Sequence, residues 1–476
     1  MPLKTMHLTN SWHEISGGIA TFYRALLDES NRRGHEMRLV VPGPTDRIED
    51  VGQFGRIYHV QGPPARLNSS YRMIYPTQFF SSGSALQKIL ASERPDLVEI
   101  CDKYTLNYFA ALLRKKLLPA LDFRPVVVGL SCERMDDNFH SYIGKIPFSD
   151  TFCSLYMKWL YFPFFDHHIA VSDYTAAELQ IAAQGQLIPR GTWVRHMGVD
   201  LGLLSPHRRS VEMRRQLFQK CGASDDSTLL LYVGRLVPEK NLSLLFELLF
   251  CLSQEHSRDY RLLVAGDGIE RARWEKVCNE RALGRALFLG HVKDQNALAD
   301  LYANADVFVH PNPREPFGIA PLEAMGSGLP LVAPNCGGVT SYANSQNAWT
   351  VEPNVESFTR AVEGITGDSL LRAQKTSRAV ATAQEYSWKR VASSFLDLYS
   401  ELCKPVQTHS DAVSAPAFYS TPAAGWRAMA FHAISQTAEQ FFSAMSRAAS
   451  GKLPSFRLGP AMTRMGNPPP NPASGE

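Results

Sequence analysis

The sequence predicts an α/β protein made of two tandem domains, each with a doubly wound parallel sheet. The chain has 476 residues, and chains beyond about 250 to 300 residues generally divide into domains. Short apolar runs alternate with helical patterns from residue 4 onward, which is typical of βαβ units. The Gly- and Pro-containing segment at 198–210 interrupts this alternation, which then starts again.

In the first half, the apolar runs predict seven strands, at KTMHLTN, MRLVVPG, RIYHV, DLVEI, RPVVVGL, HHIAVS and TWVRHM. A helix is predicted over 18–33 because Gly34 is the residue type that commonly ends one. The aromatic segment SLYMKWLYFPFF at 154–165 is interpreted as a core helix, with a surface for lipid or aglycone as the alternative. This half is assigned to a Rossmann-like domain at 1–205.

The second half repeats the pattern and is assigned to a Rossmann-like domain at 206–385. Its strands are expected at STLLLYVGRL, YRLLVAGDG, ALFLGHV, DVFVHP and PLVAP. Helices are expected from about Asn241, from about Glu270, over QNALADLYANA, after Gly318 and over about 355–384. A closing helix is assigned to 386–403. The Pro- and Ala-rich tail at 404–476 is expected to be partly disordered, with one amphipathic helix around 426–442 that docks on the protein or lies on a membrane.

The charge balance argues against nucleic-acid binding. The net charge is +3, and the tail accounts for all of it with six Lys or Arg against three acidic side chains. Residues 1–403 therefore lack the overall basic excess that such proteins show. The eight scattered cysteines form no CxxC pair and are expected to be free thiols. The beginning of the sequence has no apolar signal-peptide core, so we expect a cytoplasmic protein.

Two glutamates eight positions apart, Glu315 and Glu323, lie on either side of an expected helix start. Pro321 is tolerated only in the first turn of a helix, so the helix is expected to begin near Ile319 or Ala320. The carboxylates would then lie roughly 10 Å apart, too far to share a proton and suited to holding one elongated ligand at two points. The helix N-terminus between them offers unpaired amides to an anion, and Gly318 allows close approach. Alternatively, Glu323 only favours the helix dipole and Glu315 is solvated.

Cations and glycines elsewhere in the sequence fit an anionic ligand. Arg235 and Lys240 follow an expected strand, at the sheet edge where open α/β folds bind ligands, and could neutralise a diphosphate. A solvated turn is the alternative. Gly17 and Gly18 separate the first strand from its helix and could approach a phosphate, although alone this is a weak signal.

Taken together, the chain resembles the retaining glycosyltransferases of family 4, which have the GT-B architecture of two Rossmann-like domains facing each other across a cleft. The matching segments span about residues 6–402. In order, they are SGGIATFYRALLDESNRRGHEMRLVVPG, IAVSDYTAAEL, MGVD, YVGRLVPEKNL, LLVAGDGIER, FLGHV, LYANADVFVHPNPREPFGIAPLEAMGSGLPLVAPNCGG and YSW. The acceptor is then expected on the N-terminal domain and the nucleotide sugar on the C-terminal one.

The resemblance implies a role for each matching residue. Glu315 would face the donor sugar and the reaction centre, Glu323 would hold the ribose, and Arg235 and Lys240 would bind the departing diphosphate. The remaining donor contacts implied are Gly17, Gly18, Val292, Phe317, Gly318 and Ile319. Such an arrangement needs no metal and no cofactor, and the sequence contains no DxD triplet.

One position departs from the family. Members usually carry a histidine after a strand of the N-terminal domain, near the sugar, whereas here that strand leads into SCERMDDNFH. Cys132 takes the place of the histidine, with Glu133 and Arg134 beside it as candidate sugar or acceptor contacts. A thiol is a weaker hydrogen-bond donor than an imidazole, and Cys132 could equally be a small packed residue.

The expected activity is therefore metal-independent, retaining transfer of a sugar from a nucleotide diphosphate sugar to a hydroxyl acceptor, either lipid-linked or a glycan. Peripheral contact with the inner membrane face is expected if the acceptor is a lipid. A catalytically weak or inactive sugar-nucleotide-binding protein of the same fold is the alternative. Epimerases and phosphorylases of this architecture remain open, whereas a dinucleotide oxidoreductase is disfavoured because neither half has GxGxxG after its first strand.

Overall fold

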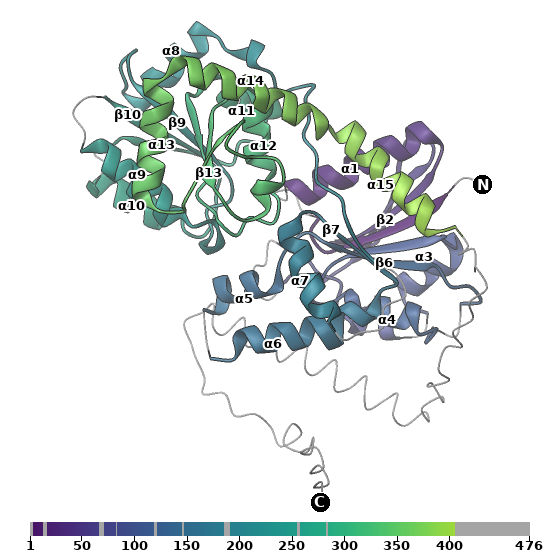
Figure 1. Cartoon of the computed structure of the whole chain (residues 1–476). Coiled ribbons are helices and arrows are strands. Elements are labelled where there is room, and N and C mark those ends of the chain that lie inside the picture. The colour runs from purple at the N-terminus through teal and green to yellow at the C-terminus, as the bar shows by residue number, and fades with distance from the viewer. Residues whose placement is uncertain are drawn as a thin grey trace, which may run out of the picture.

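A computed structural model shows two lobes, each a twisted sheet with helices on both faces (Figure 1). It describes residues 3–404 apart from 13–16, 66–70, 82, 119–120, 145–146, 185–190, 255–257 and 282–283. The amphipathic helix predicted around 426–442 lies outside the described residues. No helix in the described part of the chain is long and apolar enough to cross a membrane.

The N-terminal lobe is built on an eight-stranded sheet in the order β3-β4-β2-β1-β5-β6-β7-β8. All neighbours are parallel except β3 and β4, which form an antiparallel edge. The strands are β1 Lys4–Thr9, β2 Glu36–Gly43, β3 Arg47–Val51, β4 Gly55–Gln61, β5 Leu97–Cys101, β6 Val126–Ser131, β7 His167–Ala170 and β8 Thr192–Val194. The helices are α1 Gly18–Arg33, α2 Thr77–Phe80, α3 Ala85–Glu93, α4 Asn107–Arg114, α5 Met135–Ile143, α6 Ser149–Tyr156, η1 Met157–Tyr161, η2 Phe162–Phe164 and α7 Asp173–Ala183.

The C-terminal lobe is built on a six-stranded parallel sheet in the order β11-β10-β9-β12-β13-β14. Its strands are β9 Thr228–Val233, β10 Tyr260–Ala265, β11 Ala286–Gly290, β12 Val307–Val309, β13 Leu331–Pro334 and β14 Trp349–Val351. The helical elements are η3 Pro206–Arg208, α8 Val211–Cys221, η4 Pro238–Lys240, α9 Leu242–Ser253, α10 Arg271–Arg281, α11 Gln295–Asn304, α12 Ile319–Gly326, η5 Gly338–Ser341, α13 Val355–Gly367 and α14 Ser369–Glu385. Apart from the β3–β4 edge, both sheets are parallel with helices on each face, which confirms the predicted fold class.

The last helix, α15 Trp388–Leu402, returns to the N-terminal lobe and packs against α1 (Figure 1). The rings of Phe22 and Phe395 lie 4.8 Å apart, and the hydroxyl of Tyr399 donates to the buried carboxylate of Glu99. The two chain crossings between the lobes lie side by side. The amide of Val199 donates to the carbonyl of Tyr386 at 2.8 Å, and the amide of Trp388 donates to the carbonyl of Val199 at 3.1 Å.

The structure corrects three expectations about local structure. The helix expected over about 355–384 is two helices, because Asp368 ends α13 and caps the amide of Leu371 in α14. Strands β3 and β14 were missing from the prediction. The segment 154–165 is not uniformly core, since Tyr156 and Tyr161 are buried while the side chains of Leu155 and Trp159 are exposed.

Candidate active site

A lysine and a glutamate from different loops of the C-terminal lobe form the centre of the candidate site. Lys240 ends η4, which follows β9, and Glu315 lies between β12 and α12. The Nζ atom of Lys240 donates to both oxygens of Glu315, at 2.7 and 2.9 Å. The two side chains are 17 and 12% exposed. Lys240 and Glu315, which were predicted to act on the same ligand, are therefore in direct contact with each other.

Two further polar side chains surround Glu315. The amide of Asn312 donates to its Oε2 atom at 3.0 Å, and the Nε2 atom of His310 lies 3.8 Å from the same oxygen. Burial raises the pKa of Glu315, but the charges of Lys240 and His310 and the hydrogen bonds outweigh it, and the pKa falls to about 2. Glu315 is thus held as a carboxylate.

His310 is buried, and its Nε2 atom has no hydrogen-bond partner among the described residues. Burial lowers the pKa of His310 to about 4, with Glu315 opposing the shift, so the imidazole is neutral near pH 7. Sequence reasoning missed both His310 and Asn312. The signal was available, because His310 directly follows the apolar run of β12, at the carboxyl end of a parallel strand.

Helix α12 begins at Ile319, as predicted, with Gly318 in the left-handed region at φ 87°. A Cβ atom at Gly318 would come within 3.1 Å of Glu315 Cγ and 3.0 Å of the Tyr342 hydroxyl, so glycine is required both by conformation and by space. That hydroxyl donates to the carbonyl of Gly318, and Phe317 packs between Tyr342 and His196. The helix N-terminus is therefore fixed by its surroundings.

The second glutamate, Glu323, lies one turn into α12 and faces α11. Its Oε2 atom accepts a hydrogen bond of 2.7 Å from the Tyr302 hydroxyl. Burial raises the pKa of Glu323, and the Tyr302 hydrogen bond partly opposes this. A small cavity lies beside it, lined by Asp200, Leu203, Leu204, Gln295, Leu298, Ala299, Tyr302 and Glu323. Val292 is half-buried in the loop that leads into α11.

Arg235 lies in the same β9 loop as Lys240 but pairs differently. Its side chain is about half exposed, and its Nη2 atom lies 3.0 Å from Glu239 Oε1. The two residues predicted to bind the diphosphate, Arg235 and Lys240, thus pair with different glutamates. Arg235 is the more accessible of the two.

The N-terminal lobe meets the α12 loop directly. A Cβ atom at Gly18 would lie 2.8 Å from Ile319 Cδ1, so the predicted glycine loop and the helix N-terminus are in close contact. Around Gly17 there is open space. The Ser172 hydroxyl donates to the carbonyl of Pro316, which adds a polar contact between the lobes.

The loop after β6 carries Cys132, the residue expected at the family's histidine position. Cys132 follows β6, and its Sγ atom lies 3.6 Å from that of Cys101. Burial raises the pKa of Cys132 well above its usual range. Burial also raises the pKa of Glu133, whose carboxylate accepts a hydrogen bond of 2.7 Å from Asn138. Arg134 is engaged by Asp136 and by the carbonyl of Tyr174.

Two buried side chains hold this loop. The Nζ atom of Lys103 donates to the carbonyl of Glu133 and to the carboxylate of Glu178, whose other oxygen accepts from the amide of Met135 at 2.7 Å. No group of three or more His, Cys, Asp or Glu side chains in the described part of the chain is arranged to hold a metal ion.

Comparison with known proteins gives a consistent result for both halves. Residues 16–202 match the model described as Glycosyltransferase Family 4, and residues 213–382 match Glycosyl transferases group 1. A GDP-mannose-dependent alpha-(1-6)-phosphatidylinositol dimannoside mannosyltransferase of Mycobacterium tuberculosis is 26% identical over 404 residues, covering 83% of this chain and 95% of that protein. A GDP-mannose-dependent alpha-mannosyltransferase of Corynebacterium glutamicum is 24% identical over 409 residues, covering 84% and 89%.

Solved structures share the fold. Sucrose-phosphate synthase from Thermosynechococcus elongatus superposes with a TM-score of 0.66 at 20% identity, covering 84% of this chain and 99% of that one. Anabaena HepE in complex with UDP-glucose superposes with a TM-score of 0.60 at 17% identity, covering 84% and 100%.

Proposed function

Because this chain belongs to the family 4 glycosyltransferases of GT-B fold, we propose that it transfers a mannosyl residue from GDP-mannose, with retention of configuration, to a hydroxyl group of a glycolipid or glycan. Several of the relatives are named as GDP-mannose-dependent mannosyltransferases. Their names support this choice of sugar and base.

The contact between Lys240 and Glu315 is the observation that carries the proposal. When the anomeric bond breaks, negative charge accumulates on the departing diphosphate and positive charge on the sugar carbon. A cation and a carboxylate held together in a largely buried site can stabilise both charges at once. In the proposed reaction, Lys240 contacts the diphosphate while Glu315 stays beside the sugar. Arg235 supplies a second cation from the exposed side of the same loop.

The α12 loop would bind the rest of the donor. Its N-terminal amides face the position proposed for phosphate and sugar, and Glu323 with Tyr302 would hold the ribose hydroxyls. Gly17 and Gly18 would approach the phosphates from the other lobe, and the backbone near Val292 would contact the base. The reaction is proposed to need no metal ion, because Lys240, Arg235 and the amides together neutralise the leaving group.

The acceptor would enter from the N-terminal lobe, where Cys132 and Glu133 follow β6. Arg134 is less suited to contact the acceptor, since Asp136 already engages it. We propose that the enzyme works in the cytoplasm and contacts the inner face of the membrane when its acceptor is a lipid.

A thermal-shift panel tests the donor assignment. Full-length protein is heated with GDP, UDP or ADP, each free and as its mannose or glucose conjugate, first with EDTA and then with Mg²⁺. We expect GDP-mannose to raise the midpoint most, and equally with and without metal. A ligand at a hundred times its dissociation constant stabilises the native state by about 2.7 kcal/mol.

Product analysis then separates the enzyme from an inactive binding protein. Incubation with labelled GDP-mannose and membrane lipid extract is expected to yield a new mannoside. Binding of GDP-mannose without any product, hydrolysis included, would favour the inactive alternative, and a larger shift with UDP-glucose would overturn the choice of donor.

A further inference from the structure

Four large apolar side chains form an exposed row along α6 and η1 of the N-terminal lobe. We call Phe148, Phe152, Leu155 and Trp159 the apolar stripe, and they are 85, 39, 51 and 61% exposed. Phe152, Leu155 and Trp159 recur at spacings of three and four residues, which places them on one face of the helix, and Phe148 directly precedes α6. The opposite face is buried through Cys153, Tyr156 and Met157. The core therefore fixes this helix and leaves the stripe facing outward.

Cations lie next to the stripe. We call Lys115, Lys116 and Lys158 the basic edge. Lys158 lies 5.7 Å from the centre of the Trp159 ring, and Lys115 lies 5.9 Å from that of Phe164, in the η2 segment that follows η1. Figure 1 shows α4 and α6 along the same margin of the lobe. Lys115 and Lys116 directly follow α4, and Lys115 contacts the η2 segment that comes after the stripe.

Two of the acidic side chains in this region form ion pairs with arginines, and a third, Asp150, contacts a histidine. Asp150 lies 2.9 Å from the imidazole of His140, Asp122 lies 2.6 Å from Arg94, and Asp166 lies 2.7 Å from Arg124. By contrast, Lys116 makes no ion pair with any residue that the structure describes. The surface next to the stripe is therefore positive and attracts anions.

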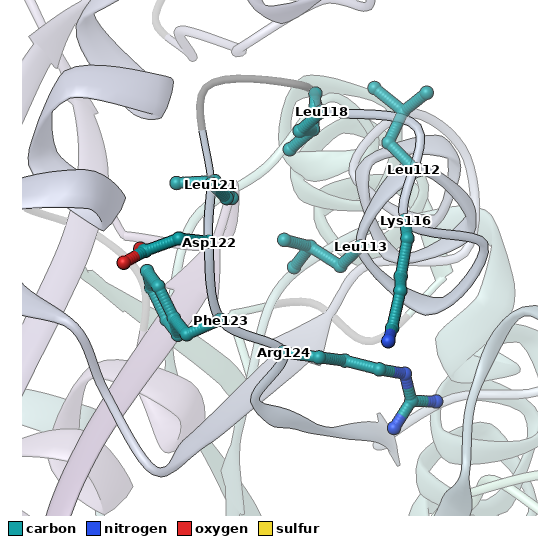
Figure 2. A pocket seen from close by; sticks show the side chains of 8 residues that line it. All are labelled: Leu112, Leu113, Lys116, Leu118, Leu121, Asp122, Phe123 and Arg124. Carbon is teal, nitrogen blue, oxygen red and sulfur yellow. The ribbon is translucent and has the colours of Figure 1, made fainter.

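A cavity of about 250 Å³ opens at the end of α4. Figure 2 shows the cavity with Lys116 and Arg124 at one end, and its other lining residues are Leu112, Leu113, Leu118, Leu121, Asp122 and Phe123. An apolar interior next to Lys116 suits the phosphate and the first part of the acyl chain of an anionic lipid. The cavity and the stripe thus fit the same kind of ligand, although they are formed by different helices.

We propose that the apolar stripe and the basic edge form the face with which this enzyme rests on an anionic lipid bilayer. Aromatic and aliphatic side chains would enter the headgroup region, while the lysines contact lipid phosphates. This inference rests on the proposed function only for the choice of a lipid acceptor. The contact surface itself follows from the exposed side chains and the lysines, and not from the name or the fold of any relative.

The position of the stripe relative to the active site supports a lipid acceptor. The N-terminal end of α6 is tied to α5 by His140, which reaches Ser149 at 3.1 Å and Asp150 at 2.9 Å. In turn, α5 lies against η4, which carries Lys240, and Asp137 of α5 lies 3.9 Å from Arg314. A headgroup that leaves the bilayer at Phe148 would therefore enter between the lobes near the proposed reaction centre.

Vesicle flotation tests the proposal, with full-length protein and without donor or acceptor. The vesicles contain phosphatidylcholine alone or mixed with phosphatidylglycerol. We expect the double variant Leu155→Ser/Trp159→Ser to lower the partition coefficient on mixed vesicles by about tenfold or more. Lys115→Gln and Lys116→Gln should each lower it by about fivefold on mixed vesicles and not on neutral ones.

Matched controls use exposed apolar side chains of the other lobe. Ile269 and Leu370 are 76 and 69% exposed, and Ile269→Ser/Leu370→Ser should float like the wild type. Phe441→Ser/Phe442→Ser tests the tail in the full chain. If the tail variant loses binding while the stripe variant keeps it, the tail is the membrane contact and the proposal fails. It also fails if the wild type does not float. It fails likewise if light scattering shows that the stripe variants turn a dimer into a monomer while their flotation is unchanged.

Transfer to the acceptor with its lipid chains removed separates this inference from the proposed function. Stripe variants should retain that reaction while losing activity on vesicle-borne acceptor. Absence of transfer by the wild type, with flotation intact, would count against the proposed function and leave the bilayer contact standing.

Discussion

Each lobe contains a largely buried lysine–glutamate pair near the loop that follows a strand. The two pairs differ in the other groups that the lysine contacts. Lys103 in the N-terminal lobe donates to the carboxylate of Glu178 and also to the carbonyl of Glu133, and both side chains of the pair are at most 7% exposed. Among the residues that the structure describes, Lys240 in the C-terminal lobe donates to Glu315 alone, and both side chains retain some exposure.

The difference indicates which pair is structural and which is available for chemistry. Lys103 donates to the carbonyl of Glu133 and to the carboxylate of Glu178 in α7, so it fixes the loop that carries Cys132 and Glu133. Lys240 is held by one group that itself belongs to the candidate site, and beside it lies His310, whose Nε2 atom has no hydrogen-bond partner within the described segments. A ligand phosphate could accept a hydrogen bond from Lys240 without depriving a backbone carbonyl of its donor.

The largest expected effect is on stability, in the N-terminal pair. Lys103→Ala should lower the free energy of unfolding by about 3 to 5 kcal/mol, because it leaves the Glu178 carboxylate buried and uncompensated. Urea unfolding measures this, with Lys389→Ala, at an exposed position, as the control. A change below about 1 kcal/mol would mean that the pair does not hold the lobe together.

The C-terminal pair should show its effect in catalysis. Lys240→Ala is expected to lower kcat/KM roughly 100-fold, a loss of about 3 kcal/mol in transition-state stabilisation. The reason is that it removes a charge-assisted contact to the leaving group. Its effect on the free energy of unfolding should be smaller than that of Lys103→Ala. Steady-state transfer assays measure the loss, and near-wild-type turnover would contradict the role given to Lys240.

His310 should make stability depend on pH. Its pKa in the folded protein is about 4, whereas an unfolded histidine titrates near 6.5. Between these values the unfolded chain binds the proton and the folded chain does not. The contribution is therefore complete above about pH 6.5 and is lost as the pH falls towards 4, by up to about 3 kcal/mol.

The variant His310→Gln isolates that contribution. Its stability should fall less steeply than that of the wild type between pH 6.5 and 4 in urea unfolding. The pKa of His168, which burial lowers to about 3, affects both proteins equally and cancels. Parallel curves for the two proteins would show that His310 is not the titrating group.

A smaller effect is expected at the other end of the donor site. Glu323→Ala should weaken GDP binding by about 2 kcal/mol, as expected for hydrogen bonds to a charged group, while leaving kcat nearly unchanged. Tyr302→Phe, which keeps the carboxylate and removes its hydrogen bond, should cost less. Calorimetric titration with GDP measures both, and a loss confined to kcat would mean that the roles of Glu323 and Glu315 are reversed.

The smallest effect is expected at Cys132, the residue predicted to replace the family's histidine. Cys132→Ala should lower transition-state stabilisation, measured by kcat/KM, by less than about 1 kcal/mol, because a partly buried neutral thiol is a weak hydrogen-bond donor. Cys101→Ala, which removes the neighbouring thiol, serves as the control. A loss of tenfold or more for Cys132→Ala alone would place the thiol at the reacting sugar.

Local signals in the sequence predicted most of the fold. Helix α1 was predicted with its observed bounds because Gly34, at φ 71°, ends it. Strand β3 was missed because its sequence RIEDV is mostly charged and lies at an exposed edge. Strand β14 has only three residues. In each case the strand is defined by pairing with a neighbour and not by its own apolar pattern.

For the candidate site, residue types and spacing could be predicted but pairing could not. The sequence singled out Lys240 and Glu315 separately, 75 residues apart, and gave no indication that they would be in contact. It also could not show that Arg235 faces Glu239, or that Leu155 and Trp159 point away from the core. Such details depend on which face of a helix or loop the rest of the fold covers.

The return of α15 to the N-terminal lobe has a consequence for synthesis of the chain on the ribosome. The strands of that lobe are complete at Val194, but the Tyr399 hydroxyl that contacts buried Glu99 is added only about 200 residues later. At roughly 5 to 20 residues per second, the interval is about 10 to 40 s. During that time the whole C-terminal lobe is made and can fold, while the lobe that was started first still lacks its last helix.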